Sequence, residues 1–217
     1  MDKNKEFNLI AKKIENCERC SLHLTRNNTV PGEGNLSANI IFVGEGPGAE
    51  EDSSGRPFVG RAGKLLDVMI KDWSNLNRSD SYITNIVKCR PPQNRKPNFD
   101  EMKACSNFLE AQILLIKPKL IVCLGASSLS YFINENITIS QARGRFFDWI
   151  NGIKIFPTFH PSYLLRNHSM EKGTPRYFSY LDFKAIGAIH KYASNGKNME
   201  EVIKVITERM KTSGGLN

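Results

Sequence analysis

Short apolar runs alternate along the chain with longer segments in which apolar residues recur every three or four positions. A strand covered on both faces reads as an unbroken apolar run, whereas the wider spacing is typical of an amphipathic helix. The runs predict strands over 39–43, 82–87 and 120–124. The wider spacing predicts helices over 3–16, 62–73, about 98–116, 127–133, 176–193 and 198–211.

Turn signals refine this order of elements. Asn98 followed by Glu101 is a capping arrangement that starts a helix, and Asn151-Gly152 is a preferred two-residue turn for a hairpin over 145–156. Strands that alternate with helices predict an α/β fold with three layers, α/β/α, around a central, mostly parallel four-stranded sheet. We expect one domain over residues 1–217, in which 196–217 form a C-terminal helix and a frayed tail.

Three unusual segments follow three of these strands. They lie after Val43, around Asn85 and at His160. Ligands of mostly parallel sheets bind at the carboxyl ends of the strands. The order of the elements alone therefore predicts that the three segments converge on one site.

The composition narrows the class of protein. The chain has no run of roughly 18 apolar residues, and its charged N-terminus lacks the apolar centre of a signal peptide. We therefore expect a cytoplasmic, monomeric protein without a membrane span. The net charge of +8 fits a polyanionic partner or a solvated lysine-rich surface, and charge alone does not separate the two.

Five cysteines are present, and four of them suit a metal site. Cys17 and Cys20 form a C-x-x-C pair, which places two thiolates on one metal or cluster. Cys89 and Cys105 could complete a set of four ligands. Zinc and an iron–sulfur cluster both remain open on these residues alone. Cys123 lies within an apolar run and is interpreted as a core residue.

Residues 44–49 match the dinucleotide-binding pattern G-x-G-x-x-A after a strand. That pattern requires a helix directly after it, so that the helix N-terminus faces a pyrophosphate. Here residues 53–57 are typical of a loop, and four acidic residues between 45 and 52 would repel a phosphate. We therefore do not interpret this segment as a nucleotide site.

Four motifs occur in order: Gly44-Glu45-Gly46-Pro47-Gly48, GRPFVGRAG over 55–63, TNIVKCRPP over 84–92 and His160-Pro161-Ser162. Together they resemble the family 4 uracil-DNA glycosylases, iron–sulfur enzymes of bacteria and archaea, over roughly residues 5–190. The resemblance implies a monofunctional enzyme that hydrolyses the N-glycosidic bond of a flipped-out deoxyuridine in single- or double-stranded DNA. It would release free uracil and leave an abasic site for base-excision repair.

The resemblance also implies residue roles. Phe58 would stack on the everted uracil, and the Asn85 amide would read the uracil carbonyl and ring N–H. His160 would stabilise the departing uracil anion, a contribution of roughly 3–4 kcal/mol for one preorganised donor. The implied sets are His160, Glu45 and Glu51 for catalysis; Gly44, Gly46, Gly48, Phe58 and Asn85 for the base; Ser162, Leu164, Leu165 and Arg166 for DNA; and Cys17, Cys20, Cys89 and Cys105 for a [4Fe–4S] cluster.

Within these sets we expect individual residues to have different roles. Glu45 is expected to orient water or stabilise charge, and Glu51 to form the pocket wall that excludes the methyl group of thymine. Either Leu164 or Leu165 is expected to wedge into the vacated base stack, with the other in the core. A phosphate-facing rim is expected from Lys88, Arg90, Arg95 and Lys96.

Two other functions remain open. One is a non-catalytic iron–sulfur protein that binds nucleic acid. The other is a relative that crosslinks to the sugar of uracil-containing DNA through an extra histidine in an inserted basic loop. No histidine-bearing insertion follows residues 57–63, which argues against crosslinking. A sliding clamp remains open as a protein partner.

Overall fold

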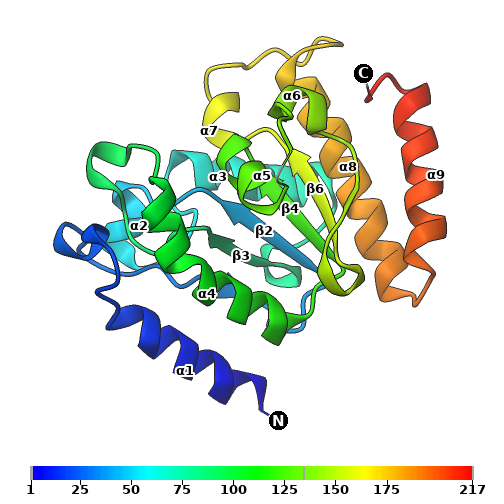
Figure 1. The fold of residues 1–217 in the computed structure, drawn as a ribbon. Coiled ribbons are helices and arrows are strands. Elements are labelled where there is room, and N and C mark those ends of the chain that lie inside the picture. The colour runs from blue at the N-terminus through cyan, green and yellow to red at the C-terminus, as the bar shows by residue number, and fades with distance from the viewer. Residues whose placement is uncertain (1, 134, 217) are drawn as a thin grey trace.

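The computed structural model describes residues 2–133 and 135–216, so that Met1, Asn134 and Asn217 lie outside the described residues. Its centre is one six-stranded sheet with the strand order β1-β3-β2-β4-β6-β5 (Figure 1). The strands are β1 (Glu33–Gly34), β2 (Ile40–Gly44), β3 (Tyr82–Asn85), β4 (Leu120–Leu124), β5 (Phe147–Asp148) and β6 (Lys154–Thr158).

The expected four-stranded sheet is the parallel centre of this larger sheet. Strands β3, β2, β4 and β6 pair in parallel, and β1 and β5 add an antiparallel strand at each edge. Each edge strand has two residues. Two residues are too few to show the alternation or the apolar run by which a strand is predicted, so β1 was not expected and the number of strands had to be corrected. Strand β5 lies within the hairpin predicted over 145–156 and pairs with β6.

Helices cover both faces of the sheet. They are α1 (Lys3–Glu15), α2 (Ala49–Ser54), α3 (Arg61–Val68), α4 (Phe99–Ile116), α5 (Ala126–Phe132), α6 (Ile139–Ala142), α7 (Pro161–Leu164), α8 (Pro175–Ser194) and α9 (Met199–Thr212). The end of α3 continues as a π-helical turn over Met69–Trp73. Among the helices in the described part of the chain, none combines the length and the apolar character needed to cross a bilayer.

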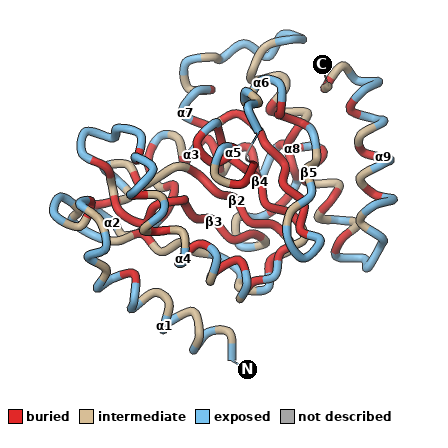
Figure 2. Tube along the Cα trace, viewed as in Figure 1, coloured by how far each residue is buried: buried red, intermediate tan, exposed pale blue. Residues whose placement is uncertain are grey.

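The alternation of side chains along the buried strands produces the three layers. Ile40 and Phe42 of β2 point into a core shared with α3, α8 and α9, whereas Ile41 and Val43 point into a core shared with α1, α4 and α5. Figure 2 shows the buried strands between the partly exposed helices. Cys123 is fully buried in the second core, as its apolar surroundings predicted.

The predicted local signals form as expected. Asn98 accepts a hydrogen bond from the Glu101 amide, and the Glu101 carboxylate accepts one from the Asn98 amide, which closes the N-terminus of α4. Asn151 and Gly152 both have positive φ angles, 56° and 73°, and the Ile153 amide donates to the Ile150 carbonyl across them. These are the features of the type I′ turn that the hairpin required.

A buried ion pair fixes the C-terminal part of the chain. Arg143 donates to the Asp182 carboxylate on α8, and its other guanidinium nitrogen donates to the Gly215 carbonyl at 2.5 Å. Asp182 also accepts a hydrogen bond from Thr158, the last residue of β6, at 2.7 Å. The tail is therefore held as far as Gly215, which is buried, and the expected fraying does not describe that residue. The same ion pair supports the end of β6.

We predict that Arg143→Ala lowers the free energy of unfolding by about 3–5 kcal/mol, because it leaves the buried Asp182 carboxylate without its counter-charge. Thermal unfolding monitored by circular dichroism measures the effect, roughly 2–4 °C per kcal/mol at this chain length. Lys211→Ala is the matched control, because the Lys211–Glu208 pair is exposed and contributes little. Equal losses in the two variants would contradict the assignment of the buried pair.

Candidate active site and cysteine pocket

The three segments that follow the strands converge on one cleft. Gly44 at the end of β2 pairs in register with Asn85 at the end of β3, so both residues reach the same edge of the sheet. His160 follows β6 directly. The cleft has a volume of about 240 Å³, and it is lined by Glu45, Gly46, Pro47, Gly48, Glu51, Phe58, Ala62, Asn85, Pro91, Asn94, Arg95, His160 and Ser162.

Gly44 allows the two sides of the cleft to meet. A Cβ atom added at this position would lie 2.5 Å from both the Asn85 Oδ1 atom and the Phe58 Cζ atom. No side chain fits such a gap, so the absence of one at Gly44 is what brings the amide and the aromatic ring together. The conjunction of an amide and an aromatic face is suited to a flat, polar ring.

The Asn85 amide is the least satisfied polar group of the cleft. Asn85 is 1% exposed, and its Oδ1 atom is buried without a hydrogen-bond partner among the described residues. Buried polar atoms in native proteins are nearly always paired, and a buried acceptor left alone costs about 1–3 kcal/mol. An unpaired amide oxygen facing a cleft therefore indicates a position where a ligand donates a hydrogen bond.

Lys88 supports the same strand end from within the protein. Its ammonium group donates to the Asn85 carbonyl at 2.8 Å, to Thr84 at 2.6 Å and to Gln112 at 2.8 Å. Lys88 is 1% exposed, and burial lowers its pKa to about 7. The expectation that Lys88 belongs to a phosphate-facing rim was therefore wrong. Arg90, Arg95 and Lys96 do reach the surface.

Glu51 ties the Phe58 loop to the start of α2. Its Oε1 atom accepts hydrogen bonds from the Val59 and Gly60 amides at 2.9 and 2.8 Å, and its Oε2 atom accepts one from the Gly48 amide at 3.1 Å. A carboxylate with three backbone partners is a structural anchor of the loop that it contacts. Glu51 lines the cleft, as expected of a pocket wall, but its oxygens are already engaged.

Glu45 has a different environment. Its Oε2 atom accepts a short hydrogen bond from the Ser127 hydroxyl at the start of α5, and no described residue bonds its Oε1 atom. Glu45 lines the base-sized cleft and also a neighbouring cavity of about 240 Å³ formed with Gly125, Ser127 and Ser162. The side chain of Glu45 thus stands between two cavities, fixed at one oxygen and free at the other.

His160 is held as a neutral donor. Its Nδ1 atom accepts a hydrogen bond from the Ser162 amide at 3.1 Å and lies 2.7 Å from the Ser162 hydroxyl. A nitrogen that accepts from an amide carries no proton, so the proton of the neutral ring is on Nε2. Burial lowers the pKa of His160 to about 4, and the Glu51 carboxylate opposes this shift only in part. The ring centroid lies 5.8 Å from that of Phe58.

The segment after His160 presents only part of the expected DNA-binding set at the surface. Ser162 and Arg166 are exposed, and Leu165 is partly buried against the core. Leu164 is fully buried, so it packs in the core and is not the wedge. Tyr163, which sequence analysis did not select, is 40% exposed. The packing of the four-residue helix α7 decides which of its side chains faces outward. A helix this short has too few apolar positions for its buried face to be predicted from the sequence.

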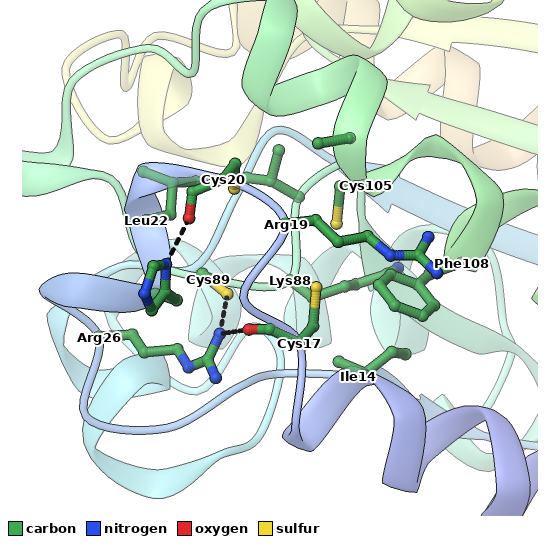
Figure 3. Close-up of a pocket in the computed structure, with 13 residues that line it drawn as sticks. Ile14, Cys17, Arg19, Cys20, Leu22, Arg26, Lys88, Cys89, Cys105 and Phe108 are labelled. Atoms are coloured by element: carbon green, nitrogen blue, oxygen red, sulfur yellow. Dashed lines mark hydrogen bonds between the residues drawn. The ribbon is translucent and has the colours of Figure 1, made fainter.

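Four cysteines line a second pocket, away from the strand ends. Cys17 and Cys20 follow α1, Cys89 follows β3, and Cys105 lies on α4 (Figure 3). Arg26 donates to the Cys89 sulfur at 3.2 Å and to the Cys17 carbonyl at 2.7 Å. Burial raises the pKa of Cys105 to about 11, so the protein alone holds this thiol protonated at neutral pH.

The thiols surround a space and do not converge on one point. Among the described residues, no three His, Cys, Asp or Glu side chains lie close enough together to hold a single metal ion. A Cys₄ zinc site requires every sulfur at about 2.3 Å from one ion. A [4Fe–4S] cluster binds each thiolate at a different iron and so tolerates wider spacing. The donor set, all sulfur with a nearby arginine, fits such a cluster.

Comparison with known proteins places this arrangement in a family. The uracil DNA glycosylase superfamily matches residues 31–183. The chain is 54% identical over 164 residues to a type-4 uracil-DNA glycosylase of Thermotoga maritima, covering 75% of this chain and 85% of that protein. It is 48% identical to the type-4 enzyme of Saccharolobus solfataricus (76% and 80% covered) and 42% identical to that of Archaeoglobus fulgidus (83% and 91%). The chain belongs to the type-4 uracil-DNA glycosylases.

The family assignment confirms the resemblance drawn from the four motifs, although one supporting argument was wrong. Residues 49–54 form the helix α2 directly after Gly48, so a helix does follow the glycine pattern, and the loop expected over 53–57 begins only at Gly55. The helix is stable there because Glu51 accepts from the Gly48 amide and closes its first turn. The Gly48 amide at the start of α2 thus has a carboxylate of the chain itself as its hydrogen-bond partner.

Three residues support the site in a way that could not be predicted from the sequence. Ser127, Lys88 and Arg78 contact site residues through single hydrogen bonds or ion pairs that only the fold creates. A serine at a helix start, and a lysine or arginine in the segment next to a strand, are common in any sequence. Their contribution becomes visible only when the partner atoms are placed.

We predict that His160 titrates near pH 4, well below the ordinary value of 6.5. The unfolded chain then takes up the proton first, so the free energy of unfolding falls as the pH drops below 6.5 and stops falling below about 4. The His160→Gln variant should lose less stability between pH 7 and pH 5 than the wild type. An NMR titration of the His160 ring, assigned with this variant, checks the value; a midpoint between 6 and 7 would contradict it.

Proposed function

We propose that the chain is a monofunctional uracil-DNA glycosylase that hydrolyses the N-glycosidic bond of an everted deoxyuridine during base-excision repair. Its relatives carry that name, and the cleft supports the assignment. The observation that carries the residue roles is the buried Asn85 amide, which has no hydrogen-bond partner in the described chain and meets an aromatic ring across Gly44. Uracil-containing DNA is the partner, and free uracil is the product.

Base recognition follows from this amide. Its oxygen accepts the ring N–H of uracil while its nitrogen donates to the adjacent carbonyl. Cytosine presents an exocyclic amine and a bare ring nitrogen instead, so an amide in the orientation that reads uracil forms neither hydrogen bond with it. Because a site built to form hydrogen bonds rejects a base that cannot form them, Asn85 discriminates uracil from cytosine. Phe58 supplies the stacking face, and the backbone of Gly44, Gly46 and Gly48 lines the slot.

His160 acts on the leaving group. Cleavage places negative charge on the uracil carbonyl oxygens and positive charge on the sugar. The neutral ring of His160 has its Nε2 proton free, because Nδ1 already accepts from the Ser162 amide. Donation of that hydrogen bond to a uracil oxygen lowers the cost of the anion without any change in the protonation of His160.

Glu45 handles the water. One carboxylate oxygen is fixed by Ser127, and the other is available to orient a water molecule or to stabilise the cationic sugar from the second cavity. Glu51 is better placed as the wall of the base pocket, because three backbone amides occupy its oxygens. Ser162, Leu165 and Arg166 are the surface residues proposed to contact the DNA.

Cys17, Cys20, Cys89 and Cys105 are proposed to hold a [4Fe–4S] cluster. The cluster supplies no step of the hydrolysis, and its role is structural. It joins the chain after α1, the segment after β3 and helix α4. The hydrogen bond from Arg26 to the Cys89 sulfur compensates part of the negative charge that four thiolates bring.

We predict that the protein releases uracil from single- and double-stranded oligonucleotides without added divalent metal, scored as strand breaks after alkali. His160→Ala should reduce turnover about 100- to 1,000-fold with little change in DNA binding, because it removes one donor to a developing anion. Asn85→Asp should reduce activity or uracil selectivity, whereas the control Asn151→Asp, at the remote hairpin turn, should not.

Each alternative has its own product in this assay. A gel-stable protein–DNA adduct would indicate crosslinking, and binding without an adduct or strand break would indicate a non-catalytic binding protein. Wild-type rates in both the His160 and the Asn85 variants would refute the residue roles while leaving the activity established.

We predict that anaerobically purified protein is brown, bleaches on reduction and contains about four irons per chain. Cys105→Ser should lose colour, iron and thermal stability together. Cys123→Ala is the matched control, because Cys123 is equally buried but lies outside the pocket, and it should keep the iron. A colourless wild-type protein with one zinc per chain would contradict the cluster.

A further inference from the structure

Phe58 carries its ring on a strained backbone. Its φ angle is +52°, in the left-handed region, which a bulky residue occupies at a cost of about 1–2 kcal/mol. Helix α3 packs directly against this backbone, since a Cβ atom added at Gly63 would lie 2.0 Å from the Phe58 carbonyl carbon. Such a conformation persists only where surrounding contacts enforce it, so the contacts that hold residues 57–60 determine where the ring lies.

On the side of the cleft, the loop is held by a negative charge. The Glu51 carboxylate accepts hydrogen bonds from the Val59 and Gly60 amides, the two residues that follow Phe58. These contacts fix the amide groups of the loop. They leave the carbonyl groups of Pro57 and Phe58, on the other side of the peptide chain, to another partner.

That partner is a positive charge. Arg78, which begins the 3₁₀ turn before β3, donates to the Pro57 carbonyl at 2.6 Å and to the Phe58 carbonyl at 3.4 Å. The same guanidinium binds Asp67 on α3 at 2.6 Å and Glu33 on β1 at 2.9 Å. Arg78 is a planar fork of five donors, and here it joins the loop, α3 and the sheet edge.

We propose that Arg78 is a positioning residue for base stacking: together with Glu51 it clamps Phe58 in its left-handed conformation, so that the ring faces the uracil slot. This inference rests on the proposed glycosylase function. It adds to that function a residue outside the cleft that sets substrate affinity. Arg78 does not line the cleft, so its effect on the base must pass through Phe58.

The surrounding charges provide a control within the protein. Arg56 also binds Glu33, at 2.8 Å, but donates to no loop carbonyl among the described residues. Burial by itself would raise the pKa of Glu33, but hydrogen bonds from Arg56 and Arg78 outweigh it and lower that pKa. Loss of either arginine weakens the Glu33 ion pair, and only loss of Arg78 releases Phe58.

A double-mutant cycle with Phe58→Ala tests the proposal on uracil-containing oligonucleotides. We expect Phe58→Ala to lower kcat/KM on the order of 10- to 100-fold, because base stacking on one aromatic ring is worth about 1–3 kcal/mol. Arg78→Ala should lower it to a similar extent, with a weaker inhibition by free uracil. The double variant should be no worse than Phe58→Ala alone within about twofold, since both changes remove the same interaction.

Arg56→Ala should keep kcat/KM and uracil inhibition within about twofold of the wild type, with only a small loss of thermal stability, because Arg56 is largely exposed. Multiplicative effects of Arg78→Ala and Phe58→Ala, or an equal loss in Arg56→Ala, would overturn the proposal. If Arg78→Ala does not fold, Arg78→Lys replaces it, because an ammonium keeps the charge between Glu33 and Asp67 but not the fork. A wild-type protein that releases no uracil would refute the proposed function itself, separately from this cycle.

Discussion

The site depends on a single close approach between two strand ends. In the parallel pairing of β2 with β3, Gly44 stands opposite Asn85, and the Phe58 ring reaches both. Any side chain at Gly44 would occupy the volume in which the amide and the ring meet. The strictest requirement of the cleft is therefore that residue 44 has no Cβ atom. The apolar strand β2 places this glycine at the edge of the sheet.

Around this contact, the side chains proposed to act on the substrate are held by neighbouring residues, and each keeps one polar atom without a partner among the described residues. Ser162 occupies Nδ1 of His160 and leaves Nε2. Ser127 occupies one oxygen of Glu45, and Lys88 holds the backbone of Asn85 while its side-chain oxygen stays unpaired. Such preorganisation costs folding free energy, because buried polar atoms remain unsatisfied until a ligand arrives. In return, these polar groups need no reorientation during the reaction, because folding has already placed them.

Sequence reasoning succeeded wherever the signal was long or chemically specific. The four parallel strands, the Asn98 cap, the Asn151-Gly152 turn and the convergence of Asn85 with His160 all depend on periodicity or on residue types with few alternatives. It failed where a tertiary contact decided the outcome. The edge strand β1 has only two residues, α2 forms because Glu51 closes its first turn, and Lys88 is drawn into the core by Thr84 and Gln112. Leu164 and Leu165 are identical in type, so only packing separates them.

The cysteine pocket and the base cleft share one short segment of chain. Cys89 lies four residues after Asn85, and Lys88 between them donates to the Asn85 carbonyl. Burial raises the pKa of Cys105 to about 11, and the positive charge of a bound metal would favour ionisation of this thiol. Under the proposed [4Fe–4S] assignment, cluster binding would therefore be coupled to the deprotonation of its thiol ligands. The proposed base-reading amide and a proposed cluster ligand thus belong to one short segment, although no described residue lines both pockets.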